Sequence, residues 1–409
     1  MTVRSLVAWI DFSAEERRRM IEVVSLFRER NTLDELGLGL VRDALADRFF
    51  PGTSTLQTRA RYFVFVPWLY SDYEQRQLDA AAIERSLRRD EVNLIGALQR
   101  SEDTDGIIGS RSGASLQRFP SSIYWNGLGA WDIRRLAGSQ EAVHRVHASR
   151  YRQRRYQART DDNEPVGGLA FATWDPDLPC RPNEFPTEAS FALTYKEAAY
   201  LRDKLLVSCR DSLLATIIDN GERGVQADFV WGHPHLGRFP DFQRAWIDHA
   251  RNFSEGLHGA TLLYNLMLAE LRQDPGLVDD YRAELAEWRN RVEARVGDWR
   301  RWDRPAFWRL VEAYRSIPIP TRRFIDSWLD LLLQEGESGF PADHSVARRL
   351  VRHREVALKR GRSRFESPRH LETWSGSSGA YQLNLRWPVA QRITDDILLG
   401  LQGDNRVGA

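Results

Sequence analysis

The feature that most constrains the fold is a dense apolar and aromatic stretch at residues 33–70, LDELGLGLVRDALADRFFPGTSTLQTRARYFVFVPWLY. Its first apolar residues recur at intervals of mostly three and four, which places them on one face of a helix. Pro51 lacks the backbone donor that a helix needs and Gly52 favours a turn, so the helix is predicted to end near Arg48. We expect the rest of the chain to surround this stretch.

The second half of the stretch is predicted to form a kinked helix. Ser54 and Gln57 have the spacing of a capping box, which places the helix start at Thr55. Residues 62–66 also have the β-branched and aromatic content of a buried strand, and Pro67 would kink a helix there. The capping signal favours the helix.

Two arginines, Arg59 and Arg61, lie in the middle of this stretch. Guanidinium groups beside exposed aromatic rings clamp phosphates and stack on bases. The competing interpretation is an arginine pair held by ion pairs at the edge of the core, and structural ion pairs are the commoner case. The sequence leaves both interpretations open.

Length and composition indicate a soluble, ordered protein. A chain of 409 residues predicts two or three domains, and 42% hydrophobic residues exclude wholesale disorder. The formal net charge is +1, so a nucleic-acid site must be a local patch. Two cysteines form neither a metal spacing nor a disulfide framework, and no segment approaches the roughly 18 apolar residues of a membrane helix. We expect a cytoplasmic protein with no cofactor and no membrane contact.

The apolar pattern predicts a mainly α, multi-helical fold with two or three helical subdomains and a few short strands. Residues 1–150 are expected to form an N-terminal helical domain whose short helices and turns allow a helix-turn-helix. Residues 151–192 form a linker, first basic and then proline-rich, and residues 193–409 form a C-terminal helical domain. A short strand is expected at residues 381–386, and residues 5–12 form either a short strand or an extended lead-in.

The C-terminal domain is expected to begin with a helix. Thr194 and Glu197 have the spacing of a capping box, which marks a helix start. From residue 277 onward, tryptophans and phenylalanines supply large side chains for a second core.

Two basic segments are candidates for contacting nucleic acid. Residues 145–159 hold six arginines and no acid, with tyrosines interleaved, a composition typical of elements that follow phosphates. Residues 345–370 hold nine arginines and lysines against two acids. A solvated linker and a solvated helix face are the respective competing interpretations. With Arg59 and Arg61, the candidate phosphate contacts are Arg152, Arg154, Arg155, Arg354, Lys359, Arg360, Arg362 and Arg364.

Histidines in the middle of the chain raise the alternative of a metal site or a general base. Metal ligation needs nitrogen or oxygen donors that converge. His249 and His258 are nine residues apart, which is not the four-residue spacing of a zinc helix, so polar packing and capping are the favoured interpretation. The residues concerned are His233, His235, His249, Glu255 and His258.

Missing motifs limit the classes of enzyme. No glycine is followed by lysine, which excludes a Walker phosphate loop and an ordinary ATPase motor. The sequence has no cysteine-histidine zinc framework and no Gly-x-Ser-x-Gly nucleophile elbow. None of the three lysines follows an acid by two residues, as the Asp/Glu-x-Lys element of restriction nucleases requires. A non-enzymatic role is favoured, and a divergent active site stays an alternative.

Three segments resemble the bacterial domain-of-unknown-function 6361 family: DELGLGLVRDALADRFFPGTSTLQTRARYFVFVPWLY, RFPSSIYWNGLGAWDI, and the run from VRHREVALKRGRSRF to LNLRW. The likeness covers nearly the whole chain, and the run of arginines, aromatic residues and Pro-Trp is its most specific part. The resemblance implies a genomic context, because members are found near helicases and phospholipase-D-like nucleases in phage-defence islands. It implies no catalytic residue.

Three functions therefore stand as hypotheses. The first is an accessory, non-motor subunit of a bacterial anti-phage or restriction-type system that binds DNA or a helicase or nuclease partner. The second is a divergent metal-dependent nuclease or nucleotide-processing enzyme that uses the histidines. The third is a scaffold whose tryptophan-rich surfaces bind other proteins.

Overall fold

A computed structural model describes residues 34–76, 78–157, 173–225, 227–334 and 342–403. Within these residues the chain is mainly helical, and one isolated antiparallel bridge joins Arg134 to Trp174. The predicted mainly α fold is confirmed. The expected few short strands are wrong for this part of the chain, which contains no strand. The strand or extended lead-in expected at residues 5–12 lies outside the described residues.

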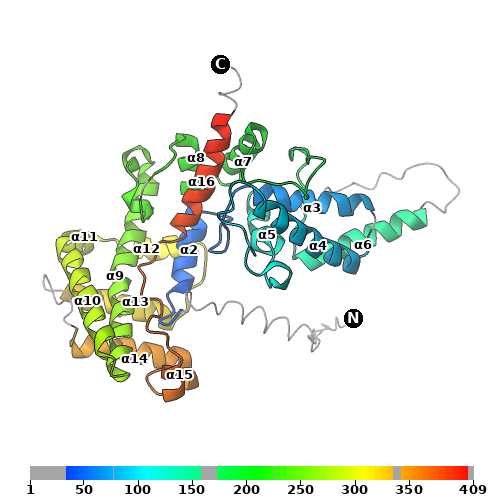
Figure 1. The fold of residues 1–409 in the computed structure, drawn as a ribbon. Helices are drawn as coiled ribbons and strands as arrows, with labels where there is room; N and C mark the ends of the chain where they lie inside the picture. The colour runs from blue at the N-terminus through cyan, green and yellow to red at the C-terminus, as the bar shows by residue number, and fades with distance from the viewer. Residues whose placement is uncertain (1–33, 77, 158–172, 226, 335–341, 404–409) are drawn as a thin grey trace, which may run out of the picture. The chain divides into compact units, whose positions relative to one another are not determined.

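Figure 1 shows the helices along the chain. None of the described ones is long and apolar enough to cross a membrane. They are α2 (Gly39–Phe49), α3 (Tyr62–Arg76), α4 (Ala80–Gln99), α5 (Pro120–Ala130), α6 (Gln140–Gln157), α7 (Tyr195–Ser208), α8 (Leu213–Asn220), α9 (Asp241–Leu271), α10 (Pro275–Ala294), α11 (Val296–Arg301), α12 (Arg304–Glu312), α13 (Ile319–Gln334), α14 (Ser345–Lys359), the short 3-10 helix η5 (Arg360–Arg362), α15 (Pro368–Glu372) and α16 (Trp387–Gln402).

The chain divides into two compact units, each assembled from separate parts of the sequence. Of the described residues, unit 1 comprises those within 34–42 and 249–383, and unit 2 those within 43–248 and 384–403. The expected consecutive domains and the helix-turn-helix stay predictions, because compactness does not show which segment folds alone.

In unit 2, helix α3 is the centre of the core. Residues 60–70 are all buried, and the ring of Phe63 stacks on that of Trp131 with 3.7 Å between ring centroids. A helical segment that is apolar all round, as residues 62–70 are, belongs inside a large core. The strand-like composition of residues 62–66 therefore does not produce a strand. The predicted helix through Pro67 is present.

The predicted capping box at Ser54 closes a turn and does not start a helix. The Ser54 N–H donates to Gln57 Oε1 at 3.2 Å, and Gln57 Nε2 donates to the Gly52 carbonyl at 3.0 Å. Helix α3 therefore begins at Tyr62 and not at Thr55.

Helices α7 and α16 are distant in sequence and pack side by side in unit 2 (Figure 1). Gly400 permits the close approach, because a Cβ at this position would lie 2.7 Å from the Ala198 Cβ. The predicted capping box starts α7. Thr194 Oγ1 accepts from the Glu197 N–H at 3.3 Å, and Glu197 Oε2 accepts from the Thr194 N–H at 2.9 Å.

In unit 1, tryptophans of other helices pack against α9 at two of its glycines, Gly256 and Gly259. Trp288 Nε1 donates to the Glu255 carbonyl at 2.7 Å, and Trp328 Nε1 donates to the Gly256 carbonyl at 2.9 Å. A Cβ at Gly259 would lie 2.2 Å from Trp288 Cζ2. The indole rings thus pack directly on the α9 backbone, and each finds an acceptor for its N–H group.

Residues 374–383, which we call the strap, run along α9 in unit 1. The expected strand at residues 381–386 is absent, because no strand lies in the described residues to pair with it. Side chains of α9 bond to carbonyls of the strap instead. Ser254, His258 and Asn265 donate at 2.8, 2.9 and 2.9 Å to the carbonyls of Leu383, Ala380 and Ser378.

Leu385 and Arg386 end the extended backbone. Their φ angles of 54° and 65° lie in the left-handed region, which no strand uses. Arg386 Nη1 donates to Asp47 at 2.6 Å and to the Thr53 carbonyl at 2.9 Å. These bonds hold the turn that starts α16.

Candidate nucleic-acid interface

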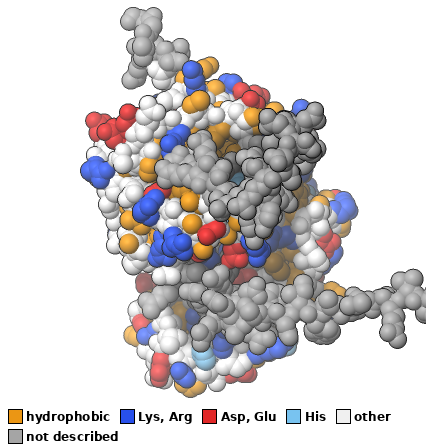
Figure 2. Space-filling view, turned by 90° about the vertical axis from the view of Figure 1, so that its right-hand side faces the viewer, with side chains coloured by type: hydrophobic (Ala, Val, Ile, Leu, Met, Phe, Trp, Pro, Cys, Tyr) orange, Lys and Arg blue, Asp and Glu red, His pale blue; other side chains and the backbone are white. Residues whose placement is uncertain are grey.

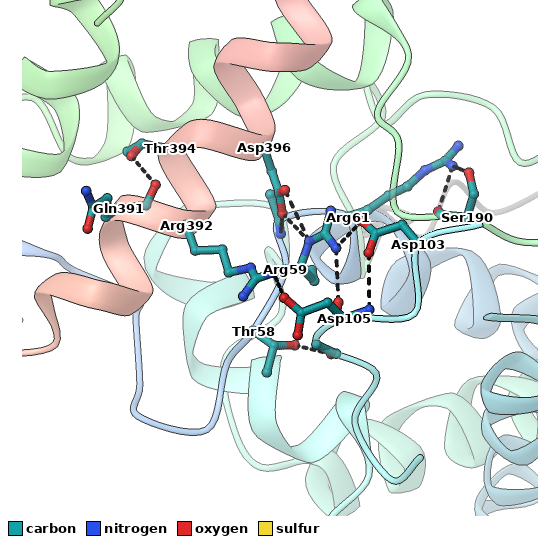
Figure 3. A network of polar contacts seen from close by, with 12 residues as sticks. Thr58, Arg59, Arg61, Asp103, Asp105, Ser190, Gln391, Arg392, Thr394 and Asp396 are labelled. Carbon is teal, nitrogen blue, oxygen red and sulfur yellow. Dashed lines mark hydrogen bonds and ion pairs between the residues drawn. The ribbon is translucent and has the colours of Figure 1, made fainter. Parts of the chain in front are cut away.

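Arg59 lies inside unit 2 among carboxylates (Figure 3). Its Nε donates to both carboxylate oxygens of Asp396, at 3.1 and 3.0 Å, and its Nη1 donates to Asp103 at 2.5 Å and to the Asp105 carbonyl at 3.0 Å. Arg392 of α16 forms an ion pair with Asp105. The Arg59 side chain is 8% exposed, so a phosphate would have to displace protein acceptors to reach it.

Arg61 ties α3 to α7 within the same unit. Its Nη2 donates to Glu197 Oε1 at 2.9 Å, and its Nη1 donates to the Ser190 carbonyl at 2.9 Å. Both Arg59 and Arg61 therefore form the internal ion pairs that the sequence left open as the alternative. Their contact with phosphate stays a prediction.

The predicted contacts Arg152, Arg154 and Arg155 belong to the last turns of α6, and their side chains lie outside the described residues. Figure 2 shows one face of the molecule, on which basic and acidic side chains are interspersed. Charge alone therefore singles out no patch among the described residues drawn there.

The basic segment of unit 1 forms α14 and the turn after it. Three of its predicted contacts serve the fold. Arg354 is 7% exposed, and it donates from Nε to the Leu36 carbonyl and from Nη2 to Thr321 Oγ1, both at 2.8 Å. Lys359 Nζ lies 2.9 Å from Glu35 Oε2, and Arg364 Nη1 donates to Glu35 Oε1 at 2.7 Å. These side chains attach the segment around Glu35 to α14.

Four other arginines, on α14 and the turn after it, point to solvent, and we call them the arginine face. Arg369 of the same segment is also exposed, but it belongs to α15. The four have no carboxylate partner among the residues that the structure describes. On α14, Ala347 and Val351 mark the buried side, and the helical period places the first two arginines on the opposite side. The four are Arg349, Arg352, Arg360 and Arg362.

Arg349 was missing from the predicted contacts, although its spacing of three residues from Arg352 was a usable signal. The acceptors that bind the buried cations could not be predicted from the sequence. Glu35 lies more than 300 residues before Lys359 and Arg364, and no local pattern connects them.

The turn that carries Arg360 and Arg362 is fixed from behind by Glu355. Ser363 Oγ donates to Glu355 Oε2 at 2.5 Å, and the Arg364 N–H donates to Glu355 Oε1 at 2.8 Å. Burial raises the pKa of Glu355, which is fully buried. Arg360 has φ 52° and ψ −131°, a conformation that favours glycine. At Gly361 a Cβ would meet no atom within 4 Å, so the tip of the turn is open.

The histidines of unit 2 do not converge on a metal geometry. The rings of His233 and His235 have centroids 6.1 Å apart, and the His235 N–H donates to His233 Nδ1 at 3.2 Å. Burial lowers the pKa of His233. His235 lies 3.5 Å from Glu222, whose carboxylate also pairs with Arg238.

The remaining metal candidates belong to unit 1, where each has protein partners. Trp302 Nε1 donates to His249 Nδ1 at 2.8 Å, and Arg251 and Arg295 pair with Glu255. His258 Nε2 donates to the strap. Burial, together with the charge of Arg291, lowers the pKa of His258 to about 4. Among the described residues, no group of three or more histidine, cysteine or acidic side chains could hold a metal ion.

Comparisons with known proteins give one match. Residues 4–398 match a family model described as a family of unknown function, DUF6361. Neither the curated proteins nor the solved structures contain a match to the chain.

Proposed function

The chain belongs to the family of unknown function DUF6361, and we propose that it binds DNA through the arginine face, as an accessory non-motor component of an anti-phage or restriction-type system. One observation carries the DNA-binding part: Arg349, Arg352, Arg360 and Arg362 are exposed and have no carboxylate partner among the described residues. The defence context and the helicase or nuclease partner rest on the family resemblance alone.

The pairing of charges within the same segment supports this choice of residues. The chain has 58 basic and 57 acidic residues, and Arg354, Lys359 and Arg364 of the same segment are held by protein acceptors. An arginine without a carboxylate keeps its guanidinium donors for a ligand. Phosphate contacts by such cations supply most of non-specific DNA affinity.

The charge count sets a measurable expectation. If each of the four arginines neutralises one phosphate, the logarithm of the affinity for duplex DNA falls with the logarithm of salt concentration with a slope of about −3.6. Buried ion pairs such as that of Arg59 would add nothing to this slope unless the core opened.

Fluorescence anisotropy with labelled duplex DNA, at low and at near-physiological salt, tests the proposal. The variant R349A/R352A/R360A/R362A is expected to lose salt-sensitive binding. A matched control removes four surface arginines that have carboxylate partners close in sequence, and should bind as wild type does. That control is R89A/R202A/R244A/R289A.

Two outcomes would contradict the proposal. Binding that does not depend on salt, or that survives loss of the arginine face, would place the contact elsewhere. No binding at low salt would leave the four arginines as solvated surface, and would favour the alternative of a protein-binding scaffold.

A further inference from the structure

The arginine face carries charge without aromatic rings. Residues 345–364 contain no phenylalanine, tyrosine or tryptophan. Proteins that bind single-stranded nucleic acid without sequence preference combine a basic groove with aromatic side chains, and each stacked base contributes about 1–3 kcal/mol. This part of the interaction is missing from the arginine face.

The aromatic residue next to the segment is already packed. Phe365 lies edge-on to Tyr264, with 5.6 Å between ring centroids, and the guanidinium of Arg352 lies 5.8 Å from the Phe365 ring. A base that stacked on Phe365 would have to displace Arg352. Residues 345–365 therefore offer cations for phosphate and no aromatic ring free for stacking.

The arginines are also arranged as a stiff array. Arg349 and Arg352 are about one helical turn apart on α14, and Arg360 follows about 12 Å of helix rise after Arg352. The turn after α14 is held by Glu355 through Ser363 and the backbone of Arg364. Cations at fixed spacing fit the regular phosphates of a duplex, whereas a single strand loses conformational entropy when it follows them.

We infer that the arginine face binds the phosphate backbone of double-stranded DNA and binds single-stranded DNA more weakly. The inference rests on the proposed function and names its substrate. Contacts to phosphates carry no sequence information, so duplexes of different sequence bind equally well.

The charge density of the two forms gives the size of the preference. Each neutralised phosphate contributes about 0.9 to the salt slope for a duplex and about 0.7 for a single strand. For four contacts the slopes are about −3.6 and −2.8. Extrapolated to about 0.1 M salt from equal affinity at 1 M, this difference alone favours the duplex about six-fold.

Anisotropy measurements with a duplex and a single strand carrying the same number of phosphates test the inference on the full chain. We expect tighter binding of the duplex, a steeper salt slope for it, and equal affinity for duplexes of unrelated sequence. Equal or tighter binding of the single strand, lost in R349A/R352A/R360A/R362A, would overturn the inference and leave the proposed function standing. Binding of neither form would remove both.

A lysine variant separates charge from stacking. In R349K/R352K/R360K/R362K the four charges remain, whereas the planar guanidinium groups that stack on bases are gone. Duplex binding is expected to stay within a few-fold of wild type, with the salt slope unchanged. A loss as large as that of the alanine variant would show that phosphate charge alone does not account for duplex binding, and would contradict a preference that rests on charge density.

Discussion

Replacing Arg360 by glycine is expected to stabilise the protein and weaken its binding to DNA. Arg360 has φ 52° and ψ −131°. The arginine, and not the adjacent Gly361, occupies the position whose conformation favours glycine. This conformation is sparsely populated by any residue with a Cβ. Arg360 has no carboxylate partner among the described residues, and its backbone conformation favours glycine. We therefore infer that its side chain has a function that offsets the cost of the strain.

The size of the effect follows from two opposing contributions. Strain at such a residue costs about 1–3 kcal/mol, and the R360G substitution removes it. Glycine also loses about 0.5–1 kcal/mol more conformational free energy on folding than a residue with a side chain. The free energy of unfolding should therefore rise by about 1 kcal/mol, within a range of about 0–2.5 kcal/mol.

The matched control is the R362G substitution two residues away. Arg362 is exposed, belongs to the same turn and has a negative φ. Glycine relieves no strain there, so R362G should lower the free energy of unfolding by about 0.5–1 kcal/mol. Each variant removes one cation, and each should reduce the salt slope of duplex binding by about 0.9.

Urea unfolding followed by tryptophan fluorescence, combined with anisotropy titrations, measures both effects on the same samples. The expected pattern is a more stable and a less stable variant that bind DNA equally weakly. R360G no more stable than R362G would refute the strain argument. Wild-type binding by R360G, alongside loss of binding in the fourfold alanine variant, would show that Arg360 is not held in place for phosphate.

Two further predictions concern unit 1. The pKa of His258 falls from 6.5 to about 4 on folding, so the folded state binds fewer protons than the unfolded chain and stability is lost as pH falls through this window, by on the order of 3 kcal/mol. H258Q keeps a donor for the strap and, in urea titrations, should lose less stability than wild type between pH 7 and pH 4. The control H353Q, on the exposed side of α14, should lose as much as wild type. Equal losses in H258Q and wild type would contradict the assignment. G259A should destabilise by about 1–3 kcal/mol because its Cβ meets Trp288, whereas G276A in the first turn of α10 has space, and equal unfolding midpoints for the two would refute the steric argument.

Local signals in the sequence predicted local structure well. The capping box of Thr194 and Glu197 depends on residues three apart, and it starts α7 as expected. Ser54 and Gln57 form one of the two capping-box hydrogen bonds, from the Ser54 N–H to the Gln57 side chain, but the next helix begins only at Tyr62. Side-chain spacing thus identified a turn correctly, while the helix start depended on which residues the core buries.

The outcome for the basic residues depended on contacts that no sequence window contains. Glu35 neutralises Lys359 and Arg364, and the Leu36 carbonyl accepts from Arg354, across more than 300 residues. A run of cations in sequence therefore splits into buried and exposed members only once the chain is folded. Helical spacing could have separated Arg349 from its buried neighbours, because it needs only the period of α14.

The hydrogen bonds to the strap constrain which changes in the sequence of α9 the fold tolerates. Ser254, His258 and Asn265 are four and seven residues apart, so all three lie on one side of a helix with 3.6 residues per turn. Losing one residue between His258 and Asn265 would rotate Asn265 by about 100° and leave the Ser378 carbonyl without this donor. Natural variants of the chain should therefore tolerate substitutions on the other sides of α9 while keeping the length between these donors unchanged.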